Sequence, residues 1–171
     1  MIRPTEERDL DAVCRIVNDN WKSVYAGHVG ASLLDENGCA ERARRLKSDF
    51  AAHKLSEFLW EENGEIAAMM SFGDSGDNDA ADALEIWRLY AAERFQGMGI
   101  GRKLLAFAEQ QAEFQGRDRI VIWAFQENIR AVAFYQKHGY CIDKEKYLGE
   151  PYCAAGVRLT KTLHPPAEQQ I

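Results

Sequence analysis

The spacing of hydrophobic positions alternates along the chain between a helical period and a strand-like period. Apolar residues at helical spacing predict four helices, at residues 9–24, 41–52, 99–115 and 128–138. Shorter apolar runs predict strands, at residues 1–3, 57–61, 65–72, 84–91, 119–124, 140–147 and 152–163. This order predicts a mixed α/β chain in which two strand-to-helix units provide local parallel pairing.

Turn-forming residues mark several boundaries between these elements. Asn63-Gly64 favours a tight hairpin turn, because both central residues of such a turn must accept positive φ. Residues 73–81 are rich in Gly, Asp and Ser and predict a mobile surface loop. From His164 the sequence is polar and predicts a disordered tail over 164–171, which leaves a single domain over residues 1–163.

Composition narrows the class of protein. With 171 residues, 46% hydrophobic and 28% charged, the chain is typical of a soluble globular domain without a membrane span. The amino terminus is charged from Arg3 and lacks a secretory signal, so we expect a cytoplasmic protein. Four cysteines without Cys-x-x-Cys spacing indicate reduced thiols and no metal site. The net charge of −6 disfavours nucleic acid as a partner.

A glycine-rich turn, Gln96-Gly97-Met98-Gly99-Ile100-Gly101, lies between a predicted strand and a predicted helix. The first N–H groups of a helix lack internal partners, and the helix dipole favours negative charge there. Glycine lets the backbone approach an anion closely, and Arg102 and Lys103 add positive charge. The turn therefore predicts a phosphate-binding site.

The spacing of the turn excludes two common phosphate ligands. A nucleoside-triphosphate loop requires Lys and then Ser or Thr after its last glycine, but Arg102 follows Gly101 and Leu104 stands where the hydroxyl is needed. A dinucleotide fingerprint requires a third glycine, where Arg102 or Leu104 stands.

The turn does match Q/R-x-x-G-x-G/A, read as Gln96, Gly99 and Gly101. With the strand 85–91 and the pattern Asn128-x-x-Ala131-x-x-Phe134-Tyr135-x-x-x-Gly139-Tyr140, the segment 84–142 resembles the GCN5-related N-acetyltransferase (GNAT) superfamily. The resemblance implies a mixed, mostly antiparallel central sheet with a parallel pair at strands 4 and 5, flanked by about four helices.

The resemblance also implies an activity, the transfer of acetyl from acetyl-coenzyme A (acetyl-CoA) to a primary amine of a small molecule or protein, by direct attack on the thioester. A longer acyl donor stays open. So does a catalytically silent acyl-CoA sensor or interaction module. A homodimer is expected from family habit alone.

By the same resemblance, the pyrophosphate lies on the amides of about Gly97 to Arg102, and the pantetheine arm lies between two parting strands. The predicted cofactor residues are Leu89, Tyr90, Ala91, Gln96, Gly97, Met98, Gly99, Ile100, Gly101, Arg102, Asn128 and Tyr135. Tyr135 matches the tyrosine that donates a proton to the coenzyme A sulfur; the alternative is a core aromatic beside Phe134. Asn128 contacts the arm or caps a helix.

Glu85 is the candidate general base, acting through water, with a solvated surface glutamate as the alternative. Strand alternation groups Glu85 with Trp87 and Leu89, opposite Leu84 and Ile86, and leaves open which face meets the acceptor. The resemblance places the acceptor over the amino-terminal helices and the last two strands, which vary most within the superfamily. Aromatic and acidic residues there are candidates to line an acceptor site for a cation: Trp21, Tyr25, His28, Tyr147, Glu150 and Tyr152. Core or dimer contacts are the alternative for these aromatics.

Overall fold

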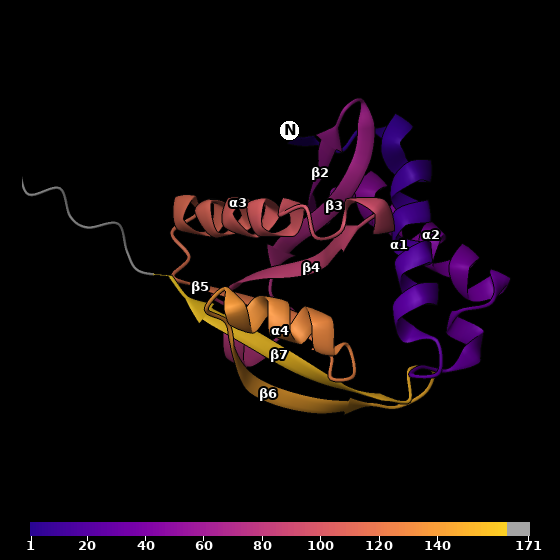
Figure 1. Ribbon diagram of the computed structural model, residues 1–171. Coiled ribbons are helices and arrows are strands. Elements are labelled where there is room, and N and C mark those ends of the chain that lie inside the picture. Colours follow the sequence, from indigo (N-terminus) through magenta and orange to yellow (C-terminus); the bar gives the residue numbers. More distant parts are fainter. Residues whose placement is uncertain (164–171) are drawn as a thin grey trace, which may run out of the picture.

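The computed structural model describes residues 1–163, and its strands join in a single sheet (Figure 1). In spatial order the strands are β1 (Ile2–Pro4), β2 (Ser56–Glu62), β3 (Glu65–Asp74), β4 (Leu84–Ala91), β5 (Arg119–Phe125), β7 (Ala154–Thr162) and β6 (Cys141–Leu148). The predicted tail 164–171 lies outside the described residues.

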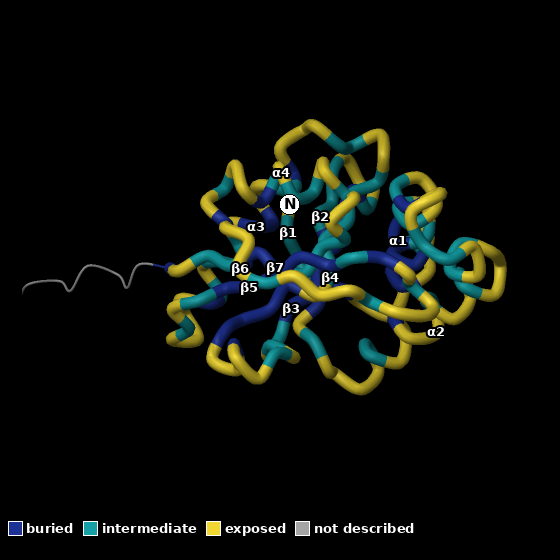
Figure 2. The backbone as a smooth tube through the Cα atoms, turned by 90° about the horizontal axis from the view of Figure 1, so that it is seen from below, coloured by how far each residue is buried: buried dark blue, intermediate teal, exposed yellow. Residues whose placement is uncertain are grey.

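Four α-helices cover the two faces of this sheet. They are α1 (Leu10–Tyr25), α2 (Glu36–Ala51), α3 (Ile100–Phe114) and α4 (Ile129–Lys137). Met70 and Phe72 of β3 pack with α3 in one core, whereas Met69 packs with α1 and α2 in a second core. Alternate residues of β3 therefore serve opposite faces. The buried trace runs along the central strands, with exposed segments around them (Figure 2).

Strand pairing is antiparallel everywhere except between β4 and β5. This confirms the mixed sheet with one parallel pair at strands 4 and 5. The expectation that two strand-to-helix units pair in parallel was wrong for the second unit. After α4 the chain enters the β6–β7 hairpin, and β7 lies between β5 and β6, antiparallel to both.

The predicted hairpin at Asn63-Gly64 is confirmed, since these residues connect β2 to β3 with φ of 52° and 78°. The second helix begins at Glu36, earlier than predicted. Asp35 caps it by accepting a hydrogen bond from the Gly38 amide over 2.8 Å. A Cβ at Gly38 would lie 2.4 Å from the Ser32 carbonyl oxygen, so this glycine permits close packing and does not break the helix.

A β-bulge in β4 changes which residues share a face. Ile86 pairs with Phe72 and Arg88 pairs with Ser71, so Trp87 is an extra residue in the strand. Beyond the bulge the alternation is inverted, and Leu89 joins Leu84 and Ile86 in the core beneath α3. The predicted grouping of Leu89 with Glu85 was therefore wrong, because regular alternation does not hold across a bulge.

The predicted loop 73–81 is only partly a surface loop. Strand β3 continues through Asp74, and residues Asn78–Ala80 form a short 3-10 helix. Ala80 is fully buried and packs with Ala83 and Val121. The segment is thus anchored to the sheet by an apolar contact that its polar composition conceals.

Candidate active site

The central feature is a cleft that opens where β4 and β5 part. The two strands pair only from Leu84 to Ile86 on β4 and from Ile120 to Ile122 on β5. Past these residues both strands continue, and the space between them is a cleft of about 520 Å³. Its walls come from β4, β5, the glycine turn, α1 and α4. The residues of β4 that follow Ile86 thus have backbone groups on the β5 side that the sheet does not use.

The glycine turn forms one rim of the cleft. Gly97 and Gly99 have φ of 80° and 77°, left-handed values that favour glycine, and Gly99 immediately precedes α3. Gly101 lies in the first turn of α3, where a Cβ would lie 3.4 Å from the Phe134 ring on α4. This arrangement leaves the amides at the start of α3 accessible, and Arg102, Arg130 and Lys137 line the same cleft.

Gln96 fixes the turn to the end of β4. Its side-chain nitrogen donates to the Ala91 carbonyl over 3.1 Å, and its oxygen accepts from Arg130 over 2.9 Å. Asn20 of α1 donates to the same carbonyl over 2.9 Å. The Ala91 carbonyl therefore accepts two hydrogen bonds from the protein. The predicted contact between Ala91 and the cofactor would then use the Ala91 amide as donor.

Tyr135 lies on α4 at the bottom of the cleft. The residue is 5% exposed, and within residues 1–163 its hydroxyl has no hydrogen-bond partner. Burial raises the pKa of this hydroxyl above its ordinary value, so it carries its proton at neutral pH. The ring packs against Phe134 and Tyr140, so the side chain is a core aromatic whose polar end faces the cleft.

Asn128 is the N-cap of α4 and also lines the cleft. Its side-chain oxygen accepts from the Ala131 amide over 3.1 Å, and its nitrogen donates to the Tyr25 hydroxyl over 3.2 Å. Both side-chain groups are thus engaged within the protein. With one exception, the predicted cofactor residues line this cleft; Met98 is absent from the lining, and its residue is 56% exposed.

The family model described as "Acetyltransferase (GNAT) family" matches residues 10–140, which include all the lining residues of the cleft, from Asn20 to His138. The chain belongs to the GNAT acetyltransferase family. It is therefore an acetyl-CoA-dependent N-acetyltransferase, and the family implies an amine as acceptor.

Among similar GNAT proteins, the uncharacterised N-acetyltransferase YuaI from Bacillus subtilis is 24% identical over 92% of this chain and 87% of its own length. The crystal structure of ribosomal-protein-alanine N-acetyltransferase from Brucella melitensis shares the fold, with a TM-score of 0.73, 22% identity and coverage of 95% and 99% of the two chains. The PaiA N-acetyltransferase from Thermoplasma acidophilum, solved with coenzyme A, has a TM-score of 0.71 at 17% identity, covering 95% of this chain and 98% of its own.

The GNAT candidate base, Glu85, is buried at the closed end of the cleft and is not among its lining residues. Its Oε2 atom accepts hydrogen bonds from the Ser75 hydroxyl over 3.0 Å and from the Gly76 amide over 2.9 Å. Burial raises the pKa of this carboxyl, although the two hydrogen bonds oppose the shift. The alternative of a solvated surface glutamate is wrong, whereas the role of base stays a prediction.

Three of the predicted acceptor residues form one aromatic cluster around Phe125. Ring centroids of Trp21 and Tyr25 lie 5.8 Å and 4.9 Å from that of Phe125, and the Tyr152 centroid lies 6.0 Å from it. The Trp21 indole donates to the Tyr90 hydroxyl over 3.1 Å. Only Tyr25 of this cluster lines the cleft, so the others support its wall.

His28 and Tyr147 lie outside the cleft lining of this GNAT protein. The His28 ring nitrogen is 3.1 Å from Glu127, between the end of α1 and the β5–α4 turn. Tyr147 is 68% exposed on β6. Within residues 1–163, no helix has the length and apolar character needed to cross a bilayer.

Sequence reasoning missed Trp87 and Trp123 as residues of the site, although both line the cleft. Each appears in the sequence as an ordinary strand aromatic. Arg88 also lines the cleft and forms an ion pair with Asp49 of α2. The sequence did offer one indication of the tryptophans' role, because each tryptophan lies in one of the two strands that were expected to separate around the pantetheine arm.

Proposed function

We propose that this GNAT enzyme transfers the acetyl group of acetyl-CoA to a primary amine of a small molecule or protein within the cleft between β4 and β5. The observation that carries the proposal is the Tyr135 hydroxyl, which faces this cleft without a protein partner among the described residues. Its high pKa keeps a proton available for the departing sulfur.

The residues of the cleft fit acetyl-CoA. When bound, this group supplies an activated acetyl thioester and three phosphates. The amides from Gly97 to Arg102 would hold the pyrophosphate, since their backbone is opened by two left-handed glycines. Arg102, Arg130 and Lys137 add charge beside them. Leu89 and the Ala91 amide offer backbone groups that β5 does not use, whereas the backbone groups of Tyr90 face Met69 on β3, in step with the hydrogen bond from the Ala92 amide to the Ala67 carbonyl.

The acceptor amine must lose a proton during transfer. No carboxylate lines the described part of the cleft, so this proton passes to water. Glu85 is the proposed final acceptor, reached through water from behind Trp87. Burial raises the pKa of its carboxyl above the ordinary value, which makes the carboxylate a stronger base.

The relatives do not identify the acceptor of this enzyme. A spermine/spermidine N(1)-acetyltransferase from Bacillus subtilis is 36% identical over only 35% of this chain, and a mycothiol acetyltransferase from Jonesia denitrificans is 36% identical over only 34%. Those short matches are consistent with a shared cofactor region and acceptor regions that differ. Homodimerisation and a cytoplasmic location stay predictions.

Thiol release tests the proposal. The purified chain is incubated with acetyl-CoA and a panel of alkylamines, arylalkylamines, polyamines, aminoglycosides, amino acids and peptide amino termini, and coenzyme A binding is measured separately by calorimetry. We expect turnover with at least one acceptor class. Tight coenzyme A binding without turnover on any amine would instead support the alternative of a silent acyl-CoA sensor.

A further inference from the structure

Two tryptophans stand at the point where the strands of the cleft separate. The last paired residues are Ile86 on β4 and Ile122 on β5, and the next residue on each strand is a tryptophan, Trp87 and Trp123. Both line the cleft, and the Trp87 residue is 43% exposed. The narrow end of the cleft is therefore bounded by two indole rings.

These rings lie on the face of the sheet opposite α3 and α4. Ile122 packs beneath those helices, so its neighbour Trp123 projects to the other face, as Phe125 does against α1. The glycine turn leads into α3. The glycine turn and both tryptophans line the same cleft, so a cofactor held at the turn would leave the tryptophan end of the cleft for the acceptor.

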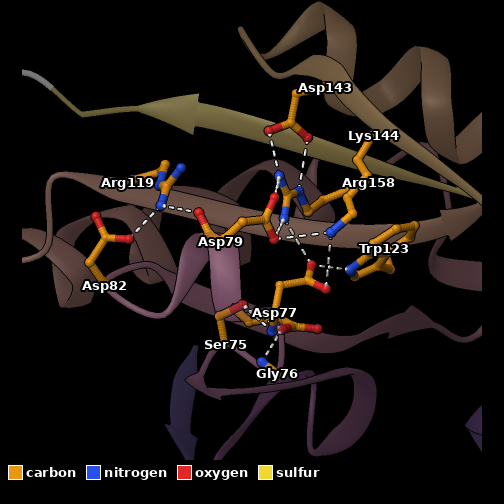
Figure 3. Close-up of polar contacts among 11 residues, drawn as sticks. Ser75, Gly76, Asp77, Asp79, Asp82, Arg119, Trp123, Asp143, Lys144 and Arg158 are labelled. Atoms are coloured by element: carbon orange, nitrogen blue, oxygen red, sulfur yellow. Dashed lines mark hydrogen bonds and ion pairs between the residues drawn. The ribbon is translucent and has the colours of Figure 1, made fainter.

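Both indole N–H groups point away from the cleft into the segment 74–79. The Trp87 nitrogen donates to the Asp74 carbonyl over 3.2 Å. The Trp123 nitrogen donates to Asp77 Oδ2 over 2.8 Å (Figure 3). Gly76 lies against Trp87, where a Cβ would be 3.1 Å from the ring. With their polar atoms occupied, the indoles present carbon surfaces to the cleft.

Arg158 holds this segment in place. It lies directly across from Trp123 on β7 and is 3% exposed. Its guanidinium makes five hydrogen bonds of 2.9–3.0 Å to three carboxylates, Asp77, Asp79 and Asp143 (Figure 3). A guanidinium has five N–H donors, so every one is used and the Asp77 carboxylate is held rigidly under the Trp123 ring edge.

The charges around the cleft favour an uncharged acceptor skeleton. No carboxylate lines its described part. Of the cationic side chains that do, Arg102, Arg130 and Lys137 are those proposed to pair with the phosphates, and Arg88 is paired with Asp49. A second ammonium group on the acceptor would therefore find no carboxylate in this lining to pair with. An apolar group would instead bury carbon surface against two indoles.

We propose that Trp87 and Trp123 form the acceptor-binding walls and select a primary amine carried on an apolar aryl or alkyl skeleton, with Asp77 and Arg158 as positioning residues for Trp123. This inference rests on the proposed function and names its substrate class. Loss of either indole then weakens acceptor binding and leaves cofactor binding intact.

The test compares 2-phenylethylamine with spermidine as acceptors. We expect wild-type kcat/KM to be at least about tenfold higher for 2-phenylethylamine, the discrimination that an apolar pocket provides. Trp123→Ala is expected to raise the KM for 2-phenylethylamine about tenfold with kcat within about twofold, and Asp77→Ala to raise it by a smaller factor. Phe114→Ala, which removes an aromatic ring that is 87% exposed at the end of α3, is the matched control with unchanged constants.

Coenzyme A affinity measured by calorimetry confirms that each variant is folded, and Trp123→Leu replaces the alanine variant if that one is insoluble. Preference for spermidine, or a KM for 2-phenylethylamine that is unchanged in the Trp123 variant, overturns the inference. If the wild type acetylates no amine, tryptophan fluorescence of the coenzyme A complex is titrated with 2-phenylethylamine. Saturable quenching that Trp123→Ala abolishes supports the acceptor-binding role of the tryptophans, although the proposed acetyl transfer has failed. Absence of quenching overturns both the acceptor-binding role and the proposed function.

Discussion

The side-chain nitrogen of Asn128 donates a hydrogen bond to the hydroxyl of Tyr25 over 3.2 Å, joining the start of α4 to the end of α1. The two residues are far apart in sequence and lie on helices that cover opposite faces of the sheet (Figure 1). Burial raises the pKa of Tyr25, so its hydroxyl is protonated and accepts this bond with a lone pair. Asn128 thereby ties the helix that carries Tyr135 to the wall of the cleft.

Asn128→Ala removes this link and the α4 cap together. We expect a loss of about 1–2 kcal/mol of stability for the cap and the hydrogen bond. For a chain of this size, that corresponds to a melting temperature lower by roughly 2–8 °C, measured by thermal unfolding. Tyr25→Phe removes only the link and should cost less. Equal losses in the two variants would show that the cap contributes little.

Tyr135→Phe tests the proton donor. The substitution keeps the packing against Phe134 and Tyr140 and removes only the hydroxyl that faces the cleft. We expect kcat to fall about 10²–10⁴-fold, the range for general acid catalysis, with the coenzyme A dissociation constant unchanged. Unchanged turnover in steady-state assays would remove Tyr135 from the mechanism and leave it a core aromatic.

The raised pKa of Tyr135 also predicts the shape of the pH profile. The hydroxyl stays protonated up to and beyond its ordinary pKa, so it produces no loss of activity on the alkaline side of neutrality. We expect kcat/KM to rise with pH as the acceptor amine loses its proton, and then to level off. A fall in kcat/KM between about pH 8 and 9 would contradict a buried, protonated donor.

Gly99→Ala tests the conformation of the glycine turn. A Cβ at Gly99 meets no atom within 4 Å, so the effect comes from its φ of 77° alone. A left-handed alanine costs about 1–2 kcal/mol, and we expect a lower melting temperature and weaker coenzyme A binding by calorimetry. Gly101→Ala is the control for stability, because Gly101 has a helical φ and only one close neighbour, Phe134. Destabilisation by Gly101→Ala alone would argue against this account.

Glu57 predicts a pH-dependent stability away from the cleft. Within residues 1–163 both its carboxylate oxygens are buried without hydrogen bonds, and the nearest cation, Arg88 Nη1, lies 3.8 Å away. Burial raises the pKa of this carboxyl, and Arg88 only partly offsets the shift. A raised pKa in the folded state means that the contribution of Glu57 to stability is present at low pH and is lost as pH rises through the folded value.

Glu57→Gln removes the ionisable group and keeps its shape. We expect the melting temperature of the variant, relative to wild type, to increase between pH 4 and pH 8, by about 3–5 °C for every 1.4 kcal/mol of stability that ionisation of Glu57 removes. Thermal unfolding of both proteins across this pH range measures the difference in melting temperature. Ser71→Ala, next to Glu57 on β3, is the control, since it removes a buried polar atom that does not titrate. A temperature difference independent of pH would mean that Glu57 titrates normally.

Local chemistry explains what could be predicted about the cofactor side. The glycine turn occupies six consecutive residues, and its left-handed φ values and helix start depend on neighbours in sequence. The hairpin at Asn63-Gly64 and the cap at Asn128 are local in the same way. The GNAT assignment followed from such segments, whose spacing a sequence shows directly.

The acceptor side was predicted less well because its geometry depends on contacts between distant residues. The bulge at Trp87 arises from pairing with β3, and it moved Leu89 to the opposite face. The segment 74–79 is held by Arg158, some 80 residues later in the chain, which its polar composition does not indicate. Tyr147 was grouped with the acceptor residues because it belongs to the last two strands, a region that varies within the superfamily, yet it is exposed on an edge strand.

The sequence by itself thus determined the class of fold, the glycine turn before α3 and the family, since each rests on short-range spacing and backbone preference. Only the tertiary structure decided which side chains meet in the cleft. It separated β4 from β5 beyond Ile86 and Ile122, turned Tyr135 toward the gap and set two tryptophans at its narrow end. Strand divergence and side-chain direction are properties of the packed sheet, so no local pattern specifies them.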